Sequence, residues 1–214
     1  MLRAGERIPV KAQLYQHQVD AFHFVMTLFR ASSEDGSGSV PSAGAALLME
    51  MGTGKTITSI AVVGAMRRAG KIRRVLIVAP LSILGVWEEE FAKFADFPYF
   101  LSLLTGSIRK KADTLRQMHG SILQIAVVNY ESAWRMEKEL LRWNADLVIA
   151  DEGHKIKTHN ISASKTMHKL GAKARYKLLL TGTVITNKAS DVFSQYKFID
   201  PTVFGESFYS FRME

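Results

Sequence analysis

Short runs of branched apolar residues alternate along the chain with longer amphipathic stretches, and this alternation restricts the possible fold more than any other feature. Residues 74–79 read RVLIVA, an apolar run without the polar positions expected of a strand that has one face in water. Strands of this kind lie in parallel sheets with helices on both faces. The pattern predicts an α/β fold with strands over 45–49, 74–79, 99–104, 123–128, 147–150 and 176–180.

The intervening stretches have helical spacing of apolar residues, except for a Ser- and Gly-rich loop over 31–44. We expect helices over 14–30, 55–68, 84–94, 107–118, 131–143, 162–170 and 189–198. The length of 214 residues suits one domain with a sizeable core, so we expect residues 1–214 to form a single domain. Ligands in such sheets bind at the carboxyl ends of the strands.

Composition excludes several classes of protein. The chain has no cysteine, which excludes disulfides, thiol catalysis and zinc–cysteine sites. It has no apolar run of the roughly 18 residues that a transmembrane helix needs, and its N-terminus lacks the apolar core of a signal peptide. These features fit a cytoplasmic protein that does not enter a membrane.

The formal net charge is +8, and the excess is uneven. The stretch 153–190 contains no acidic residue, and a field of one sign attracts a polyanion such as nucleic acid. A solvated basic surface with no partner is an alternative that charge alone leaves open. The basic residues of this stretch are Lys155, Lys157, Lys165, Lys169, Lys173, Arg175, Lys177 and Lys188.

The hexapeptide MGTGKT follows a predicted strand and opens a predicted helix. Glycines let backbone N–H groups approach phosphate oxygens, and the helix N-terminus adds its positive end. Lys55 would reach the β- and γ-phosphates and would face solvent in the empty protein, while Thr56 would offer its hydroxyl to Mg²⁺. The strand before and the helix after disfavour a simple glycine-rich turn. The predicted nucleotide-binding loop comprises Gly52, Thr53, Gly54, Lys55 and Thr56.

Two adjacent carboxylates, Asp151 and Glu152, end another predicted strand in the sequence DLVIADEGH. Asp151 would hold Mg²⁺ through its water shell, because Mg²⁺ prefers oxygen ligands and retains waters. Glu152 would orient and deprotonate the attacking water. A turn with two solvated acids is the alternative, and the phosphate loop upstream in the same fold disfavours it. Together with Lys55, these residues form the predicted catalytic set.

Several segments, taken in order, resemble superfamily-two helicases, and more closely the Swi/Snf-type, helicase-like DNA translocases. GTGKT, DEGH and TGT follow one another as in that family, and the resemblance covers roughly residues 12–210. The other segments that carry the resemblance are LYQ (14–16), VLIVAPLSILGVWEEEFAKF (75–94), VVNYESA (127–133), DEGHKIKTHNISASK (151–165), LLLTGTVITN (178–187) and FIDPTVFG (198–205).

The resemblance implies a RecA-like P-loop NTPase lobe that uses ATP and Mg²⁺, with Gln16 near the adenine. It implies that His154, Thr181, Gly182 and Thr183 couple the nucleotide state to the nucleic-acid path. The residues that it places against the nucleic-acid backbone are Pro80, Leu81, Ser82, Asn129 and Tyr130.

Three positions depart from the family pattern, and one of them is Thr53, which stands where leucine is frequent. Gly153 stands where alanine is usual, which we expect to have a mild effect, and Val184 stands where proline is usual, which leaves its effect on coupling open.

The activity implied is ATP hydrolysis that drives movement along double-stranded DNA. DNA is chosen over RNA by the resemblance alone, because phosphate contacts carry no base information. An RNA-directed helicase lobe and a nucleic-acid or protein-binding module without turnover remain alternatives. A small-molecule phosphotransferase is disfavoured, because it would leave the other motifs unexplained.

Motors of this family work with two lobes, and the second lobe supplies arginines to the ATP. We expect the 214 residues to hold only the first lobe, so that the chain alone binds nucleotide weakly and hydrolyses it slowly or not at all. The lobe has no long insertions, which fits a cytoplasmic bacterial or phage protein; a eukaryotic source would imply the nucleus.

Overall fold

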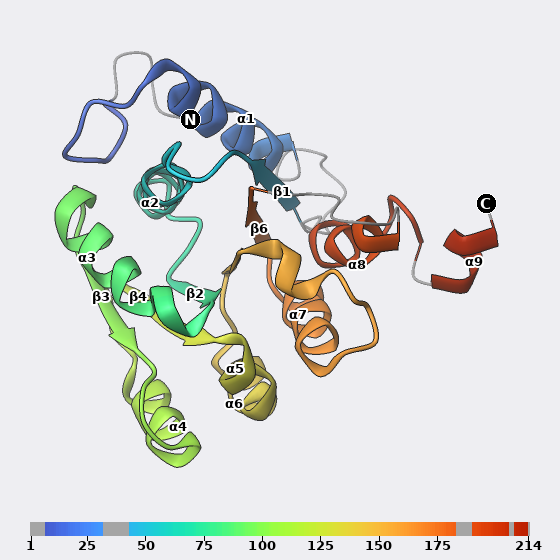
Figure 1. Ribbon diagram of the computed structural model, residues 1–214. Coiled ribbons are helices and arrows are strands. Elements are labelled where there is room, and N and C mark those ends of the chain that lie inside the picture. The colour runs from blue at the N-terminus through green and yellow to red at the C-terminus, as the bar shows by residue number, and fades with distance from the viewer. Residues whose placement is uncertain (1–6, 32–42, 183–189, 206–207, 214) are drawn as a thin grey trace.

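The computed structural model describes residues 7–31, 43–182, 190–205 and 208–213. The described strands form one parallel sheet of six strands in the order β1-β6-β5-β2-β4-β3, with helices on both faces (Figure 1). The predicted α/β class is therefore confirmed. The strands are β1 (Ala43–Leu48), β2 (Arg74–Ala79), β3 (Tyr99–Leu103), β4 (Leu123–Asn129), β5 (Leu147–Asp151) and β6 (Tyr176–Thr181).

Successive side chains of each central strand enter different layers of the core. In β2, Val75 and Ile77 pack on one face, and Leu76 and Val78 pack on the other. The first face is covered by α1 (Gln16–Ala31), α2 (Lys55–Arg68) and α3 (Leu84–Phe94). The second face is covered by α4 (Ile108–Gln117), α5 (Tyr130–Arg135), α6 (Glu137–Trp143), α7 (Ser162–Lys173) and α8 (Ser190–Ile199).

Helix α2 is enclosed by its neighbours. Every residue from Ile57 to Met66 is buried, because α1 and α3 flank the helix while the sheet lies beneath it. A helix enclosed in this way holds its first turn in a fixed position. That turn lies at the carboxyl end of β1, where the glycine-rich loop enters the helix.

The sequence prediction of one helix over 131–143 is wrong. The backbone leaves helical geometry at Met136, with φ −108° and ψ 19°, and α6 begins at the next residue. The Met136 side chain is fully buried, so core packing overrides the helical periodicity on either side. A short helix that was not expected, α9 (Phe208–Met213), follows α8, and its Phe208 ring stacks on His159 at a centroid distance of 3.9 Å.

Two short 3₁₀ turns, η1 (Leu81–Ile83) and η2 (Gly153–Ile156), follow β2 and β5. Within the described residues, no helix is long and apolar enough to cross a membrane.

Candidate nucleotide-binding site

The loop between β1 and α2 has the backbone geometry that its glycines permit. Gly52 and Gly54 have φ of 78° and 92°, in the left-handed region that side chains disfavour. Thr53 closes the turn: its hydroxyl donates to the Glu50 carbonyl at 2.7 Å. Gly54 is the N-cap of α2 and offers no side-chain cap hydrogen bond, so the backbone N–H groups of the first turn remain available to a ligand. A helix N-terminus of this kind favours the binding of an anion.

Lys55 occupies the first turn of α2 and is half-buried. Its ammonium donates to the carbonyl oxygens of Met49 and Glu50 at 2.9 and 3.0 Å. The expectation that Lys55 faces solvent is therefore wrong: the ammonium is held across the mouth of the loop, because two backbone carbonyls face it. Thr56 follows it in the same turn and is also half-buried.

Asp151 ends β5 and is 6% exposed. Both of its carboxylate oxygens accept hydrogen bonds: Oδ1 from the Glu152 backbone N–H at 2.9 Å, and Oδ2 from the Trp87 indole N–H at 2.9 Å. Its carbonyl oxygen accepts a further bond from the Tyr130 hydroxyl at 2.6 Å. Three elements thus fix the position of this residue.

The ionisation of Asp151 reflects opposing influences. Burial raises the pKa of Asp151 above its ordinary value, and the charge of Glu152 acts in the same direction. The hydrogen bonds from Trp87 and Glu152 oppose this rise in the pKa, as does the positive charge of Lys55. Cationic Lys55 is therefore near enough to favour the charged carboxylate.

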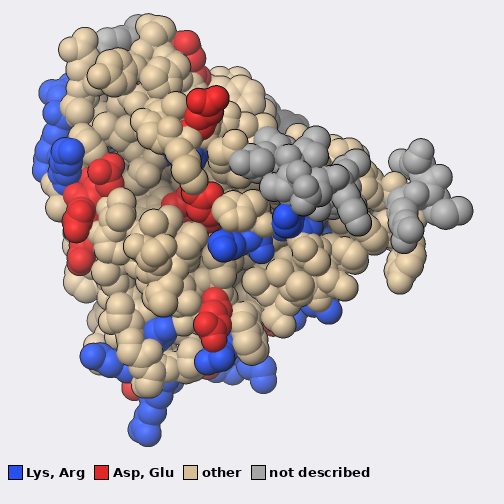
Figure 2. Space-filling view, in the orientation of Figure 1, with Lys and Arg blue, Asp and Glu red and all other residues tan. Residues whose placement is uncertain are grey.

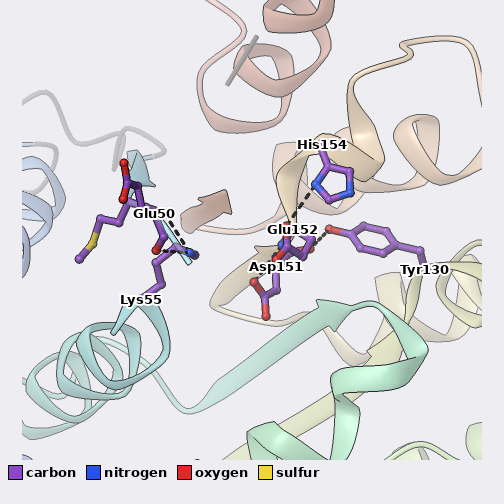
Figure 3. A network of polar contacts seen from close by, with 7 residues as sticks. Glu50, Lys55, Tyr130, Asp151, Glu152 and His154 are labelled. Carbon is purple, nitrogen blue, oxygen red and sulfur yellow. Dashed lines mark hydrogen bonds and ion pairs between the residues drawn. The ribbon is translucent and has the colours of Figure 1, made fainter. Parts of the chain in front are cut away.

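Glu152 has a left-handed backbone conformation, with φ 52° and ψ 60°, which turns the chain sharply out of β5 into η2. Its carboxylate Oε2 lies 3.1 Å from His154 Nδ1. Figure 3 shows Lys55 on one side and Asp151, Glu152 and His154 on the other, with the Tyr130 hydroxyl pointing toward the acidic pair. Glu152 and His154 therefore contact each other at the end of β5, a contact that the sequence analysis did not predict.

Strand order brings the phosphate loop and the acidic pair together. β6 lies between β1 and β5, and Leu48 is in register with Thr181 while Asp151 is in register with Leu180. The three strands therefore end at one edge of the sheet. The Met49 N–H donates to the Thr181 carbonyl at 3.2 Å, so the predicted coupling segment contacts the start of the phosphate loop.

The predicted coupling residues begin at the end of β6. Thr181 is buried and Gly182 is exposed. Thr183 and Val184 lie outside the described residues.

Gln16 is not the glutamine that contacts the phosphate loop. Its side chain is exposed and donates to Asp20 at 2.8 Å. Gln18, which is 6% exposed, donates to the Thr53 carbonyl at 3.0 Å and accepts from the Tyr15 N–H at 3.0 Å. Helical spacing could have identified it, because Gln18 lies four residues before buried Phe22 on the inner face of α1.

The residues assigned to the nucleic-acid backbone separate into two groups. Leu81 is 71% exposed, and Pro80 and Ser82 lie beside it at the carboxyl end of β2. Asn129 and Tyr130, at the end of β4, are buried, and the Tyr130 hydroxyl is bonded to Asp151. The structure therefore places the Tyr130 side chain inside the fold, in contact with Asp151, and leaves Pro80, Leu81 and Ser82 on the surface.

The cations of the basic stretch differ in their exposure. Lys177 is 2% exposed in β6, where burial lowers its pKa to about 8, and Lys169 is paired with Glu137 at 2.6 Å. Lys155, three residues after Glu152, is exposed. In Figure 2, acidic and basic side chains lie next to one another near the middle of the face shown. Lys188 lies outside the described residues.

Trp87 is the residue that sequence reasoning missed. Its position four residues before Phe91 on the buried face of α3 predicts a core side chain. A buried indole nevertheless needs an acceptor for its N–H group. Which acceptor it meets depends on the packing of α3 against the sheet, and the sequence does not give that.

A family model described as SNF2-related domain matches residues 15–214. The chain is 34% identical over 163 residues to the ATP-dependent DNA helicase DDM1 of Arabidopsis thaliana, covering 72% of this chain and 20% of that protein. It is 30% identical over 175 residues to the DNA repair and recombination protein RAD54B of Gallus gallus, covering 76% of this chain and 18% of that protein. The chain thus spans about a fifth of the length of these relatives.

Among solved structures, the chain is similar to the Sulfolobus solfataricus SWI2/SNF2 ATPase core in complex with double-stranded DNA. The TM-score is 0.78 at 26% identity, over 96% of this chain and 39% of that chain. A structure of the Sulfolobus solfataricus SWI2/SNF2 ATPase core domain gives a TM-score of 0.75 at 25% identity, over 100% of this chain and 40% of that chain.

Proposed function

Because the chain belongs to the SNF2-related domain family, we propose that it is the ATP-binding lobe of an ATPase that moves along double-stranded DNA. The observation that carries the proposal is the meeting of two motifs at one edge of the sheet. The glycine-rich loop ending in Lys55 and Thr56 and the acidic pair Asp151 and Glu152 follow β1 and β5, which are separated by β6 alone.

The phosphate loop supplies the binding energy for the nucleotide. The first turn of α2 offers backbone N–H groups, and Gly52 and Gly54 keep side chains away from the phosphates. Lys55 exchanges its bonds to the Met49 and Glu50 carbonyls for the β- and γ-phosphates. These carbonyls hold the ammonium in place beforehand, so less conformational entropy is lost on binding.

The residues present fit a magnesium ion. A buried carboxylate, Asp151, lies close enough to Lys55 to feel its charge, and the hydroxyl of Thr56 is in the same loop. Oxygen ligands of this kind are the ones that Mg²⁺ takes beside phosphates. When bound, the ion would neutralise charge that develops on the phosphates. Thr56 and Asp151 would hold it.

Glu152 is placed to orient the attacking water and accept its proton. Its backbone turns away from β5, and its carboxylate is partly exposed and lies beside the ring of His154. His154 would couple this carboxylate to the neighbouring surface, where Lys155 is exposed. Thr181, Gly182 and Thr183 would carry the same signal from the phosphate loop.

The partner we propose is double-stranded DNA. The carboxyl end of β2 carries a surface formed by Pro80, Leu81 and Ser82, on the same edge of the sheet as the acidic pair. Lys155, which follows the acidic pair in the sequence, adds positive charge to this edge. The solved ATPase core with a TM-score of 0.78 is described as bound to double-stranded DNA. Such a motor would work in the nucleus of a eukaryote or in the cytoplasm of a bacterium.

We further propose that a second lobe completes the site. The chain covers 39% of the similar ATPase core, which leaves room there for another domain. Arginines supplied across a domain interface contribute roughly 10³–10⁵ in rate to phosphoryl transfer. The 214-residue chain by itself should therefore turn ATP over slowly or not at all.

The decisive experiment compares ATP hydrolysis, with and without double-stranded DNA, by the 214-residue chain and by its two-lobe parent. We expect DNA-stimulated hydrolysis by the parent only. Lys55→Ala should abolish nucleotide binding, and Glu152→Gln in the parent should retain ATP binding and lose turnover. Motor-like hydrolysis by the chain alone would show that the second lobe is not needed. A parent that binds DNA without turnover would indicate a binding module, and stimulation by RNA instead of DNA would indicate an RNA-directed lobe.

A further inference from the structure

The indole of Trp87 connects the hydrophobic core to the acidic pair. Its Nε1–H donates to Asp151 Oδ2 at 2.9 Å. Trp87 is 1% exposed and Asp151 is 6% exposed, so water does not compete for this bond. Hydrogen bonds to a charged acceptor in a buried site are roughly twice as strong as neutral ones.

Helix α3 determines where this donor lies. Leu84, Trp87 and Phe91 form its buried face, and the Trp87 and Phe91 rings are 6.2 Å apart between centroids. The helix follows β2, which pairs with β5 through Val78 and Ala150, one residue before Asp151. Packing of the Trp87 ring therefore fixes its N–H group with respect to the end of β5. A carboxylate that rotates away from this N–H group loses the hydrogen bond, because the indole does not move with it.

The two oxygens of Asp151 are held from different directions. Oδ1 accepts the Glu152 backbone N–H at 2.9 Å and Oδ2 accepts the Trp87 indole. A carboxylate has about four lone-pair sites, so each oxygen retains capacity for another ligand. Rotation about the Cβ–Cγ bond would break both hydrogen bonds, so the indole adds a second restraint on the orientation of the carboxylate.

A second buried tryptophan offers a comparison. Trp143 is 7% exposed, and its indole donates to the Met118 carbonyl at 3.3 Å. That bond links α6 to the end of α4, remote from the strand ends that carry the acidic pair. Both residues fill core volume and both satisfy their N–H group. They differ in that the acceptor of Trp87 is a charged side chain in the candidate site.

We propose that Trp87 is a positioning residue that holds the Asp151 carboxylate in the orientation from which it binds the magnesium ion of Mg–ATP. The proposal rests on the proposed function, because it assumes that Asp151 serves that ion. Partners that orient metal-binding side chains typically contribute 10- to 100-fold to metal affinity or activity. Loss of the indole N–H should therefore weaken the dependence of nucleotide binding on Mg²⁺ and leave metal-free binding nearly unchanged.

The test measures binding of a fluorescent ATP analogue to the two-lobe parent by anisotropy, in EDTA and over a titration of MgCl₂. Trp87→Phe removes the donor and keeps an aromatic ring, and Trp143→Phe is the matched control for lost core volume. We expect Trp87→Phe to need roughly 10- to 100-fold more Mg²⁺ for half-maximal enhancement of binding. Its affinity in EDTA should stay within about twofold of wild type, and Trp143→Phe should match wild type in both conditions.

A Trp87→Phe protein with the Mg²⁺ dependence of Trp143→Phe would overturn the proposal. If Trp87→Phe melts below the assay temperature, 3-benzothienylalanine at position 87 keeps the bicyclic shape and lacks only the N–H donor. A raised Mg²⁺ requirement in that protein would support the proposal, and an unchanged Mg²⁺ requirement would overturn it. A wild-type parent whose nucleotide binding does not respond to Mg²⁺ would instead overturn the proposed function, which is a different result in the same titration.

Discussion

Glu152 has a backbone conformation that its side chain does not favour. Its φ of 52° places it in the left-handed region, which costs a residue other than glycine about 1–3 kcal/mol. The other described residue of this kind is Asn144, which ends α6 and belongs to the residue types that tolerate the conformation. Glutamate does not, so the surrounding contacts must maintain the strain. The Tyr130 hydroxyl on the Asp151 carbonyl is one such contact.

Gly153 is a second residue where local geometry matters, and we predict that Gly153→Ala destabilises the fold. A methyl group there would lie 2.6 Å from Leu179 Cδ1 and 2.8 Å from Leu179 Cγ. Overpacking of this kind costs about 1–3 kcal/mol, so the effect should be larger than the mild one expected from the family pattern. Urea denaturation would measure the free energy of unfolding.

A double-mutant cycle with Leu179→Ala provides the control for the Gly153 prediction. The two changes should be non-additive by about 1 kcal/mol or more, because the new methyl group occupies space that the truncated leucine vacates. Simple additivity, or a neutral Gly153→Ala, would mean that the backbone of η2 relaxes freely.

Gln18 and Gln16 form a natural pair of test sites in α1. We predict that Gln18→Ala lowers nucleotide affinity about five- to tenfold, because it removes the bond to the Thr53 carbonyl of the phosphate loop, which is worth about 1 kcal/mol. Gln16→Ala should change affinity less than twofold, since its side chain is exposed and donates to Asp20 of the same helix. Titration of a fluorescent ATP analogue would compare them. The reverse order of effects would restore Gln16 as the glutamine near the adenine.

At the scale of elements, α7 and α8 are joined by a half-buried histidine. His168 Nε2 lies 2.9 Å from the Ser194 carbonyl, and burial lowers the pKa of His168 to about 4. The Ser194 bond opposes this shift, whereas the nearby charges of Lys197 and His159 add to it. The neutral imidazole, with its proton on Nε2, is therefore the form that joins the two helices.

This histidine predicts a loss of stability in mild acid. The pKa is about 4 in the folded state and 6.5 in the unfolded chain, so the unfolded state binds more protons between those values. Stability should fall as the pH drops from about 6.5 to about 4, by ~2 kcal/mol after discounting for partial exposure. Urea denaturation at pH 7.5 and pH 4.5 measures the difference.

The control for the acid prediction uses a side chain that does not titrate. His168→Gln keeps an N–H donor for the Ser194 carbonyl and should lose this part of the pH dependence. His23→Gln, at an exposed position of α1, should retain it. An unchanged pH profile in His168→Gln would show that other groups cause the acid sensitivity.

Considered as a whole molecule, the parallel α/β sheet could be predicted because its strands are continuous apolar runs such as RVLIVA. The phosphate loop and the acidic pair could be located because each follows such a strand. The order β1-β6-β5-β2-β4-β3 is not a property of any one segment, since it depends on which strands pair. For the same reason the contact of Trp87 with Asp151 could not be predicted: it joins residues 64 positions apart.

The distribution of charge is another property of the whole fold. Lysines that are neighbours in sequence are separated by folding: Lys177 enters the core and Lys169 pairs with Glu137, while Lys155 is exposed at the edge where β5 ends. Net charge therefore overstates the surface available to a polyanion. The position of each cation relative to the strand ends is what matters for a DNA path along that edge.

This argument predicts that Lys155 contributes more to DNA binding than an equally exposed lysine elsewhere. Lys71, which precedes β2 at the opposite edge of the sheet, is the matched control. Lys155→Ala should weaken binding of double-stranded DNA roughly 5- to 10-fold at 0.1 M salt and reduce the slope of log K against log salt by about 0.9, the effect of one phosphate contact. Lys71→Ala should change neither. Fluorescence anisotropy of a labelled DNA duplex titrated with the two-lobe parent, from 50 to 300 mM NaCl, would measure both the affinity and the salt slope. Equal effects of the two variants would mean that DNA binding follows net charge and not a path along the carboxyl ends of the strands.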